Sequence, residues 1–346
     1  MRIAIIADAS LTQINGVVNT LQETCRCLRN IGHEVLLLTP DDAATFACPT
    51  YPEIRLAYKP YRRVAASLRD FQPDCLHIST EGPMGLAARR FCLRHKIGFT
   101  TAYHTRFPEY LSARAMMPKA VTYRWLRWFH WPSKAVMVPT PHMIAALQKR
   151  GFRRLVLWGR GVDTERFQCI EQDRSCIQRP LYLYVGRVAI EKNIAAFLDA
   201  DLPGSKWIIG DGPMREELQL RYPDTHFLGS KLHQELSAYY NCADVLVFPS
   251  ETDTFGLVML EAMACGVPIA AYPVCGPIDV VRDGVSGSLE FDLRRACIQA
   301  LRLDRHQVRE HALTYSWELA TQQFLQSLYR VDAIKTMEWA QMSIIS

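Results

Sequence analysis

The sequence predicts an α/β protein with two doubly wound units, each built on a parallel sheet, that face a common cleft. Its length of 346 residues and its 49% hydrophobic content allow two globular domains with separate cores. Short β-branched runs alternate with helical patterns, which is typical of buried parallel strands joined by helices. A polar, irregular stretch divides this alternation into two series. In sheets of this kind, ligands bind beyond the carboxyl ends of the strands.

The first series fills the N-terminal part of the chain. Strands are expected at Arg2–Ala7, His33–Leu38, Asp74–Ile78, Gly98–Ala102, Ala135–Pro139 and Leu155–Trp158. Helices between some of them are expected at Val17–Arg29, Pro83–His95 and Pro141–Arg150. After Asp163 the sequence turns polar and irregular up to about Pro180, which we interpret as a linker.

The second series follows this linker. Its strands are expected at Leu181–Val185, Lys206–Ile209, Thr225–Leu228, Asp244–Phe248 and Val267–Ala271. Its helices are expected near Lys192–Asp199, Met214–Arg221, Leu232–Asn241 and Gly256–Ala264, and the chain from Leu293 onward reads as helical. We therefore expect one domain at residues 1–165, a second at 166–315 and a helical segment at 316–346.

Composition excludes several classes of protein. The net charge of +5 is mild, and no nucleic-acid motif accompanies the basic residues, so we expect no nucleic-acid partner. The 11 cysteines are scattered without a CxxC pair, which fits a reducing compartment. The apolar run Arg2–Ala7 is too short for a signal peptide or a membrane span, and no later run reaches spanning length. We expect a cytoplasmic protein, either soluble or peripheral.

The most informative segment is Pro249–Gly266, which leaves a strand through a polar loop and enters a helix. The free amides at the start of this helix form an anion site, and they belong to Phe255, Gly256 and Leu257. Asp253 before the helix and Glu261 inside it can accept hydrogen bonds from sugar and ribose hydroxyls. The alternative is an N-capping Asp253 and a surface Glu261.

Two cations follow the first strand of the second series. Arg187 and Lys192 come directly after the strand end at Gly186, where they could balance a diphosphate and its growing charge. The alternative is an ion pair with Glu191 and solvent-facing side chains.

Glycine-containing turns follow two other strands. Gly212 lies in the tight turn Gly210–Pro213, which means little alone but is placed to contact the donor alongside Arg187 and Lys192. Gly16 lies between the first strand and the first helix, where glycine would let the backbone approach a phosphate. A simple turn before a helix explains Gly16 equally well.

The first domain carries candidates for binding an acceptor. His104 follows a predicted strand, although a lone histidine is more often structural. The weaker candidates after strand ends are Arg106, Glu109, Tyr110 and Glu81.

A tryptophan stripe lies in the same domain. At about 100° per residue, Trp125, Trp128 and Trp131 share one helix face, beside Arg124 and Arg127. Aromatic rings next to cations suit an anionic bilayer surface. The alternative is a core helix whose rings pack on the sheet.

Together these segments resemble glycosyltransferase family 4 of the GT-B fold, including bacterial lipid and mannosyl transferases. The resemblance covers nearly the whole chain in the same order. Its landmarks are Asn15–Val18, His104-Thr105, Gly161–Asp163, Val185–Arg187, Gly210–Pro213 and Asp253–Glu261. Two departures are Asp253, where the family usually has Glu, and Cys275-Gly276, where Gly-Gly is more usual.

The resemblance implies roles for single residues. It implies that Arg187 and Lys192 bind the donor diphosphate, that Glu261 binds the ribose, and that Asp253 contacts the transferred hexose. It places His104 beside the donor sugar. It also implies that the last helix crosses back to the first lobe.

The resemblance further implies a retaining hexosyltransferase that needs no metal and no cofactor, because the nucleotide-sugar is a co-substrate. The implied partners are a GDP-mannose or UDP-hexose donor and a lipid or glycan acceptor at the inner face of the cytoplasmic membrane. Two alternatives stay open. One is a nucleotide-sugar epimerase or hydrolase of the same fold, and the other is a non-catalytic protein that binds sugar nucleotides.

Overall fold

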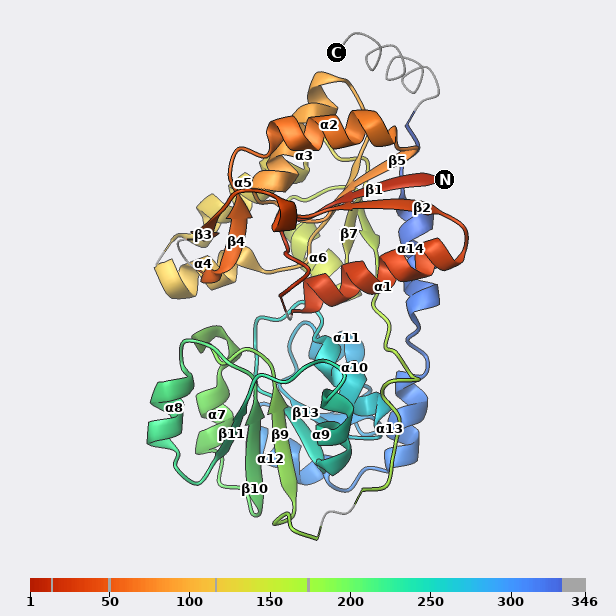
Figure 1. The fold of residues 1–346 in the computed structure, drawn as a ribbon. Helices are drawn as coiled ribbons and strands as arrows, with labels where there is room; N and C mark the ends of the chain where they lie inside the picture. Colours follow the sequence, from red (N-terminus) through yellow and green to blue (C-terminus); the bar gives the residue numbers. More distant parts are fainter. Residues whose placement is uncertain (14, 49–50, 116, 173–174, 332–346) are drawn as a thin grey trace. The chain divides into compact units, whose positions relative to one another are not determined.

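The structure, a computed structural model, describes residues 1–13, 15–48, 51–115, 117–172 and 175–331 (Figure 1). It divides into two compact units: unit 1 holds residues 1–159 with the chain from 317 onward, and unit 2 holds residues 160–316. The boundary falls after residue 159 and not after residue 165, and Val162, which lies between these positions, is buried in the core of unit 2. The end of the expected helical segment, residues 332–346, lies outside the described residues.

Unit 1 is built on a six-stranded parallel sheet with the order β2-β1-β5-β6-β7-β8. Its strands are β1 (Arg2–Ile6), β2 (Glu34–Leu38), β5 (Cys75–Ile78), β6 (Thr100–Ala102), β7 (Val136–Val138) and β8 (Leu155–Leu157). Each lies within a range that the sequence predicts. The register pairs Arg2 with Glu34 and Ile6 with Leu38.

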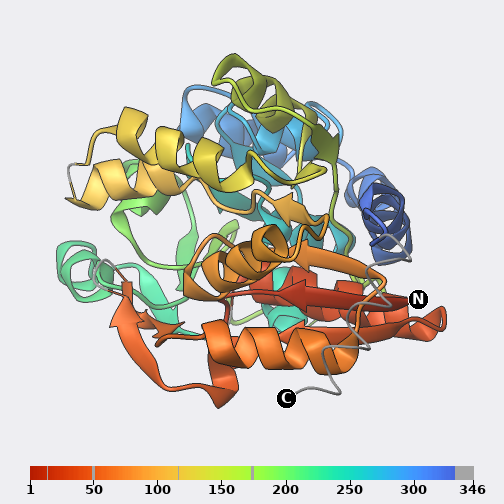
Figure 2. The ribbon, with the colours of Figure 1, turned by 90° about the horizontal axis from the view of Figure 1, so that it is seen from above.

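Helices cover both faces of this sheet. Figures 1 and 2 show α2 (Tyr61–Phe71) and α3 (Pro83–Arg94) on one face, and α1 (Gly16–Asn30) with α14 (Trp317–Ser327) on the other. The alternation along β1 explains both layers, because alternate residues of a strand point to opposite faces. Ala4 and Ile6 join the core of α2 and α3, whereas Ile3 and Ile5 join that of α1 and α14.

Unit 1 also contains elements that the sequence analysis did not name. They are η1 (Pro40–Asp42), β3 (Thr45–Cys48), β4 (Tyr51–Ala57), α2 and α4 (Phe107–Ala115). The helix expected for the tryptophan stripe is α5 (Lys119–His130), and α6 (Pro141–Lys149) completes the unit as expected. β3 and β4 form an antiparallel hairpin. The hairpin could not be predicted from a buried apolar run in the sequence, because residues such as Phe46 are exposed.

Unit 2 repeats the plan with the parallel strand order β11-β10-β9-β12-β13-β14. Its strands are β9 (Leu181–Val185), β10 (Ser205–Ile209), β11 (His226–Gly229), β12 (Val245–Phe248), β13 (Ile269–Ala271) and β14 (Gly287–Leu289). Its helices are η2 (Ile190–Lys192), α7 (Ile194–Asp199), α8 (Arg215–Arg221), α9 (Leu236–Cys242), α10 (Leu257–Ala264), α11 (Pro277–Val280), α12 (Leu293–Ala300) and α13 (Arg305–Ala312).

The helix expected from Leu232 begins later, at Leu236. The amide of Leu232 donates to the side chain of Glu235 at 2.7 Å, so residues 232–235 form a turn outside the helix. This turn contains His233, which contacts Glu261.

The strand β9 separates two cores in the same way as β1. Leu183 and Val185 pack with α9, α10 and α13, whereas Tyr182 and Tyr184 pack with α7, α8 and α12. Among the helices that the structure describes, none is both long and apolar enough to cross a bilayer.

Candidate active site

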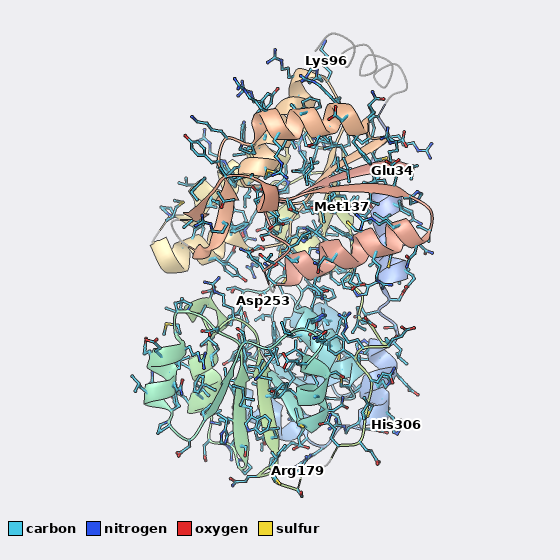
Figure 3. The ribbon with its side chains drawn as sticks, in the orientation of Figure 1. Glu34, Lys96, Met137, Arg179, Asp253 and His306 are labelled. Atoms are coloured by element: carbon cyan, nitrogen blue, oxygen red, sulfur yellow. The ribbon has the colours of Figure 1, made fainter. Side chains whose placement is uncertain are left out.

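The strand order of unit 2 fixes where a ligand binds. β9 is the first strand of the unit; β10 and β11 continue on one side of it, and β12, β13 and β14 on the other. Such a switch in strand order opens a crevice at the carboxyl ends of the two central strands. The segments 186–192 and 249–256 leave β9 and β12 at this edge. In Figure 3, Asp253 lies at this end of unit 2 and Arg179 at the opposite end.

Three glycines shape the turn that carries Arg187. A Cβ on Gly210 would lie 1.8 Å from the carbonyl oxygen of Gly186, and one on Gly212 would lie 2.3 Å from that of Val188. The turns after β9 and β10 are also joined by the amide of Val188, which donates to the Asp211 carbonyl at 2.9 Å. Gly212, predicted to contact the donor, is therefore required by packing of one backbone against another.

A buried tyrosine donates a hydrogen bond to the turn that carries Arg187. The Tyr184 hydroxyl donates to the backbone carbonyl of Arg187 at 2.8 Å. The sequence does not indicate Tyr184 as a site residue, because a tyrosine inside a buried strand is expected to be part of the core.

The second cation is paired with a predicted site residue. Lys192 Nζ lies 2.5 Å from Asp253 Oδ1, and both side chains are largely buried. Burial alone would lower the pKa of Lys192, but attraction to Asp253, followed by Tyr184, outweighs it and raises the pKa above its ordinary value. Lys192 thus pairs with Asp253 across the two segments and is not the solvent-facing side chain of the alternative reading.

The loop before α10 is positioned by glycines and hydroxyls. Gly256, the N-cap of α10, has φ +87° and, being glycine, offers no side chain to cap the helix. The hydroxyl of Thr252 donates to the Glu191 carbonyl at 3.3 Å, which ties the loop to the segment after β9. The Cβ of any residue replacing Gly276 would lie 3.1 Å from the Asp253 carbonyl. The N-cap position of α10 is therefore Gly256 and not Asp253.

Glu261 is buried and held on both oxygens. Its Oε2 accepts from the Tyr240 hydroxyl at 2.9 Å, and its Oε1 lies 2.9 Å from His233 Nε2. Burial and the neighbouring Glu261 raise the pKa of Tyr240 well above its ordinary value, so the phenol remains the donor. Glu261 is not a surface residue. Sequence analysis missed His233, although it follows the carboxyl end of β11 at the same edge of the sheet.

The acceptor-side candidates belong to unit 1. His104 is buried with its ring edge on Trp158, at 5.4 Å between ring centres. Glu109 accepts from the Tyr123 hydroxyl at 2.8 Å and from Arg106 at 3.1 Å.

The other unit 1 candidates are Glu81, Tyr110 and Gly16. The Glu81 carboxylate is buried 3.2 Å from His130 Nε2. Tyr110 is partly exposed on α4. Gly16 is the first residue of α1, where the Asn15 side chain accepts from the amides of Val17 and Val18 at 3.0 and 2.9 Å. This cap supports the reading of Asn15-Gly16 as a turn before a helix.

The tryptophan stripe is a surface feature. Trp125, Trp128 and Trp131 are 38%, 52% and 58% exposed, and the buried face of α5 contains other residues. Arg89 lies 3.9 Å over the ring of Trp128, and Arg153 lies 5.2 Å over that of Trp131. The alternative in which these rings pack into the core is wrong.

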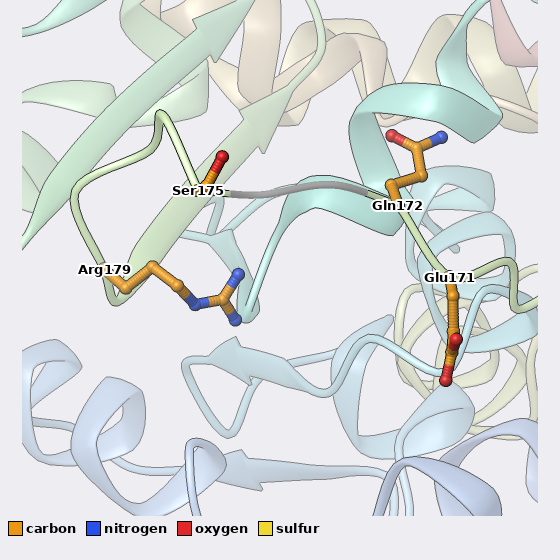
Figure 4. Close-up of a pocket in the computed structure, with 4 residues that line it drawn as sticks. All are labelled: Glu171, Gln172, Ser175 and Arg179. Carbon is orange, nitrogen blue, oxygen red and sulfur yellow. The ribbon is translucent and has the colours of Figure 1, made fainter.

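One hollow of unit 2 lies away from the site. It has a volume of about 460 Å³ and is lined by Glu171, Gln172, Ser175 and Arg179 (Figure 4). Arg179 precedes β9, so the hollow is at the amino ends of the strands. Throughout the described ranges, no group of three or more His, Cys, Asp or Glu side chains is placed to hold a metal ion.

Two doubly wound units, one of them with a paired lysine and aspartate and a glycine-capped helix start at its switch point, are typical of the GT-B class of glycosyltransferases. The family profile "Glycosyltransferase Family 4" matches residues 14–166, and "Glycosyl transferases group 1" matches residues 179–302. The chain belongs to glycosyltransferase family 4 and is a hexosyltransferase.

Similar proteins agree with this assignment. A GDP-mannose-dependent alpha-mannosyltransferase of Mycobacterium tuberculosis is 28% identical over 98% of this chain and 99% of its own length. The sulfoquinovosyl transferase SQD2 of Arabidopsis thaliana is 28% identical over 92% of this chain and 72% of its own. The alpha-monoglucosyldiacylglycerol synthase of Streptococcus pneumoniae is 25% identical over 96% of this chain and 86% of its own.

Solved structures share the fold. Sucrose-phosphate synthase from Thermosynechococcus elongatus has a TM-score of 0.77 at 20% identity, with full coverage of both chains. Anabaena HepE in complex with UDP and glucose has a TM-score of 0.72 at 15% identity, covering 94% of this chain and 99% of HepE.

Proposed function

We propose that this protein transfers a hexose from a nucleoside-diphosphate sugar to a lipid or glycan acceptor, with retention of the anomeric configuration. The observation that carries the proposal is the Lys192–Asp253 pair, which joins the segments after β9 and β12 at the switch point of the unit 2 sheet. A fixed cation beside a carboxylate suits a ligand with a phosphate next to hydroxyl groups.

GDP-mannose is the first donor to test, and UDP-hexoses are the second. The full-length similarity to a GDP-mannose-dependent alpha-mannosyltransferase supports the first. The glycolipid synthase relative and the acceptor chemistry in its name, diacylglycerol, support a lipid acceptor.

The donor-site residues suit this reaction. Arg187 and Lys192, with the amides of Phe255, Gly256 and Leu257, would neutralise the leaving diphosphate. As the bond from the sugar C1 to the phosphate oxygen breaks, the acceptor oxygen bonds to C1 on the same face. The acceptor proton passes to the leaving phosphate, so no protein nucleophile is required. Asp253 would contact the hexose.

Because two cations and helix amides supply the charge neutralisation in this proposal, no metal and no cofactor is required. Turnover should be unchanged, within about twofold, after treatment with a chelator such as EDTA, measured as transfer of labelled hexose. Loss of activity that added Mg²⁺ or Mn²⁺ restores would contradict this part of the proposal.

We extend the proposal to an anionic membrane surface at the inner face of the cytoplasmic membrane. The exposed tryptophans of α5 and the arginines against them support it, since such rings insert at the headgroup level while the cations meet anionic lipid. Flotation with vesicles containing phosphatidylglycerol should recover the protein at low salt. The variant with Trp128→Ala and Trp131→Ala should float less, whereas Phe291→Ala, an 82% exposed aromatic of unit 2, should float as the wild type does. Absence of wild-type flotation at low salt would overturn the extension.

The transfer itself is tested in two steps. A thermal-shift panel of UDP-, GDP- and ADP-sugars identifies the stabilising donor. That donor, labelled in the sugar, is then offered to a lipid extract, and the anomeric form of the product is read by NMR. A retained α-linked product supports the proposal, and sugar release without an acceptor product favours the epimerase or hydrolase alternative. Donor binding without turnover on any lipid or glycan extract favours the non-catalytic alternative.

A further inference from the structure

The carboxylate of Glu261 has one protein donor on each oxygen. Tyr240 donates to Oε2 from the buried side, and His233 contacts Oε1 from the turn after β11. A carboxylate offers about four lone-pair sites. One site on each oxygen is therefore left over, which matches two hydroxyls on neighbouring carbons.

The hydrogen bonds fix the state of the His233 ring. Its Nδ1 lies 2.8 Å from Nη1 of Arg166. A guanidinium has only donors, so Nδ1 must accept. The ring proton is then on Nε2, and Nε2 donates to Glu261.

The His233 ring is also held in place from the segment that follows the unit boundary. Asp163 accepts from the amide of Arg166 at 3.0 Å and pairs with its guanidinium at 3.6 Å. The ring of Phe167 meets that of His233 edge-on, at 5.2 Å between centres. The segment that begins at Gly161–Asp163 thus positions His233 through Arg166 and Phe167. His233 in turn contacts Glu261.

We propose that His233 is a positioning residue for the ribose of the donor: it orients Glu261 so that its two remaining lone pairs face the 2′- and 3′-hydroxyls. This inference rests on the proposed role of Glu261 in the donor site. The His233 side chain is 29% exposed, whereas that of Glu261 is 8% exposed, so His233 can be replaced at little cost to the core. It acts through Glu261 and does not itself bind the reacting atoms.

The test compares GDP and UDP with their 2′,3′-dideoxy analogues by titration calorimetry on the full chain. The wild type should bind the ribonucleotides more tightly than the dideoxy forms. His233→Ala should weaken ribonucleotide binding about three- to tenfold, the size expected for loss of one hydrogen bond, and leave the dideoxy forms unchanged. His233→Gln, which can still donate an N–H to Glu261, should restore much of the loss. His226→Ala, an exposed histidine of β11, is the matched control and should have no effect.

Three results would overturn the inference. If His233→Ala keeps the full preference for ribose, His233 does not position Glu261. Equal weakening of ribonucleotide and dideoxy binding would indicate a general change in the site. If the wild type itself shows no preference for ribose, the assignment of Glu261 in the proposed function fails as well. If only His233→Ala behaves otherwise than expected, the role of His233 fails and that of Glu261 stands.

Discussion

At the scale of single residues, the site depends on polar groups that are held in a buried environment. Lys192 and Asp253 stabilise each other's charges, and Tyr184 fixes the backbone next to Arg187. A buried charge that lost its partner would be costly, so each residue depends on the other. The sequence predicts Lys192 and Asp253 as site residues, but it does not show that they pair, because the two residues are 61 positions apart.

Tyr184 and Tyr182 form a natural comparison on one strand. The Tyr184 hydroxyl donates to the Arg187 carbonyl, whereas the buried Tyr182 hydroxyl has no hydrogen-bond partner in the described parts of the chain. Tyr184→Phe should lower the free energy of unfolding by about 1 kcal/mol and reduce kcat/KM, because the Arg187 turn loses its support. Tyr182→Phe should be neutral or slightly stabilising. Urea unfolding and transfer kinetics of both variants check this, and equal effects would contradict it.

The raised pKa of Lys192 gives a prediction about pH. A lysine whose folded pKa is raised keeps its charge, and its contribution to stability, until the pH rises above its unfolded value of about 10.4. Binding of GDP or UDP by the wild type should therefore be flat from about pH 7 to 9. In Asp253→Asn the burial remains without the largest attraction, so the pKa of Lys192 falls and binding should weaken as the pH rises, starting at a lower pH than in the wild type.

Calorimetry at several pH values measures this difference. Asp199→Asn, which removes an exposed carboxylate paired with Arg221, is the control and should keep the wild-type profile. A flat profile for Asp253→Asn would mean that Lys192 does not depend on this partner.

At the scale of elements, backbone contact between turns positions the cations. The turns after β9 and β10 lie so close that no side chain fits at Gly210 or Gly212. The sequence shows the Gly210–Pro213 turn but not its purpose, since a turn motif says nothing about which other turn it contacts. The β3–β4 hairpin and the late start of α9 escape sequence analysis for a related reason: exposed strands and local side-chain turns leave no apolar period.

A comparison of Gly210 with Gly284 distinguishes the energetic cost of close contact from that of backbone strain. Both have φ in the left-handed region, but a Cβ on Gly284 would meet nothing within 4 Å, whereas one on Gly210 would meet the Gly186 carbonyl. Gly284→Ala should cost about 1 kcal/mol of unfolding free energy from strain alone. Gly210→Ala should cost a further ~1–3 kcal/mol from overpacking and should weaken nucleotide binding. Equal costs in thermal and urea unfolding would show that the contact between the turns carries no energy.

At the scale of the whole molecule, the sequence predicts the two parallel sheets and the edge at which the candidate residues of unit 2 gather. This succeeds because buried parallel strands have a strong apolar signature and because polar residues at strand ends share one edge. The boundary between units is less predictable, since Val162 lies just before the polar stretch and Phe167 lies within it, yet both fill the core of unit 2. The partners of Glu261 are also hidden, because Tyr240 and His233 come from a different strand–helix connection.

The central claim is that the switch point of unit 2 binds a nucleoside-diphosphate sugar through Arg187, Lys192 and Glu261. The most direct measurement is transfer of labelled hexose by Arg187→Ala, using the donor that stabilises the wild type, with Arg221→Ala as a control from an exposed ion pair. The account predicts that Arg187→Ala loses at least about a hundredfold in turnover while its circular dichroism and melting temperature stay close to those of the wild type. A folded Arg187→Ala protein that transfers hexose at nearly the wild-type rate would contradict it.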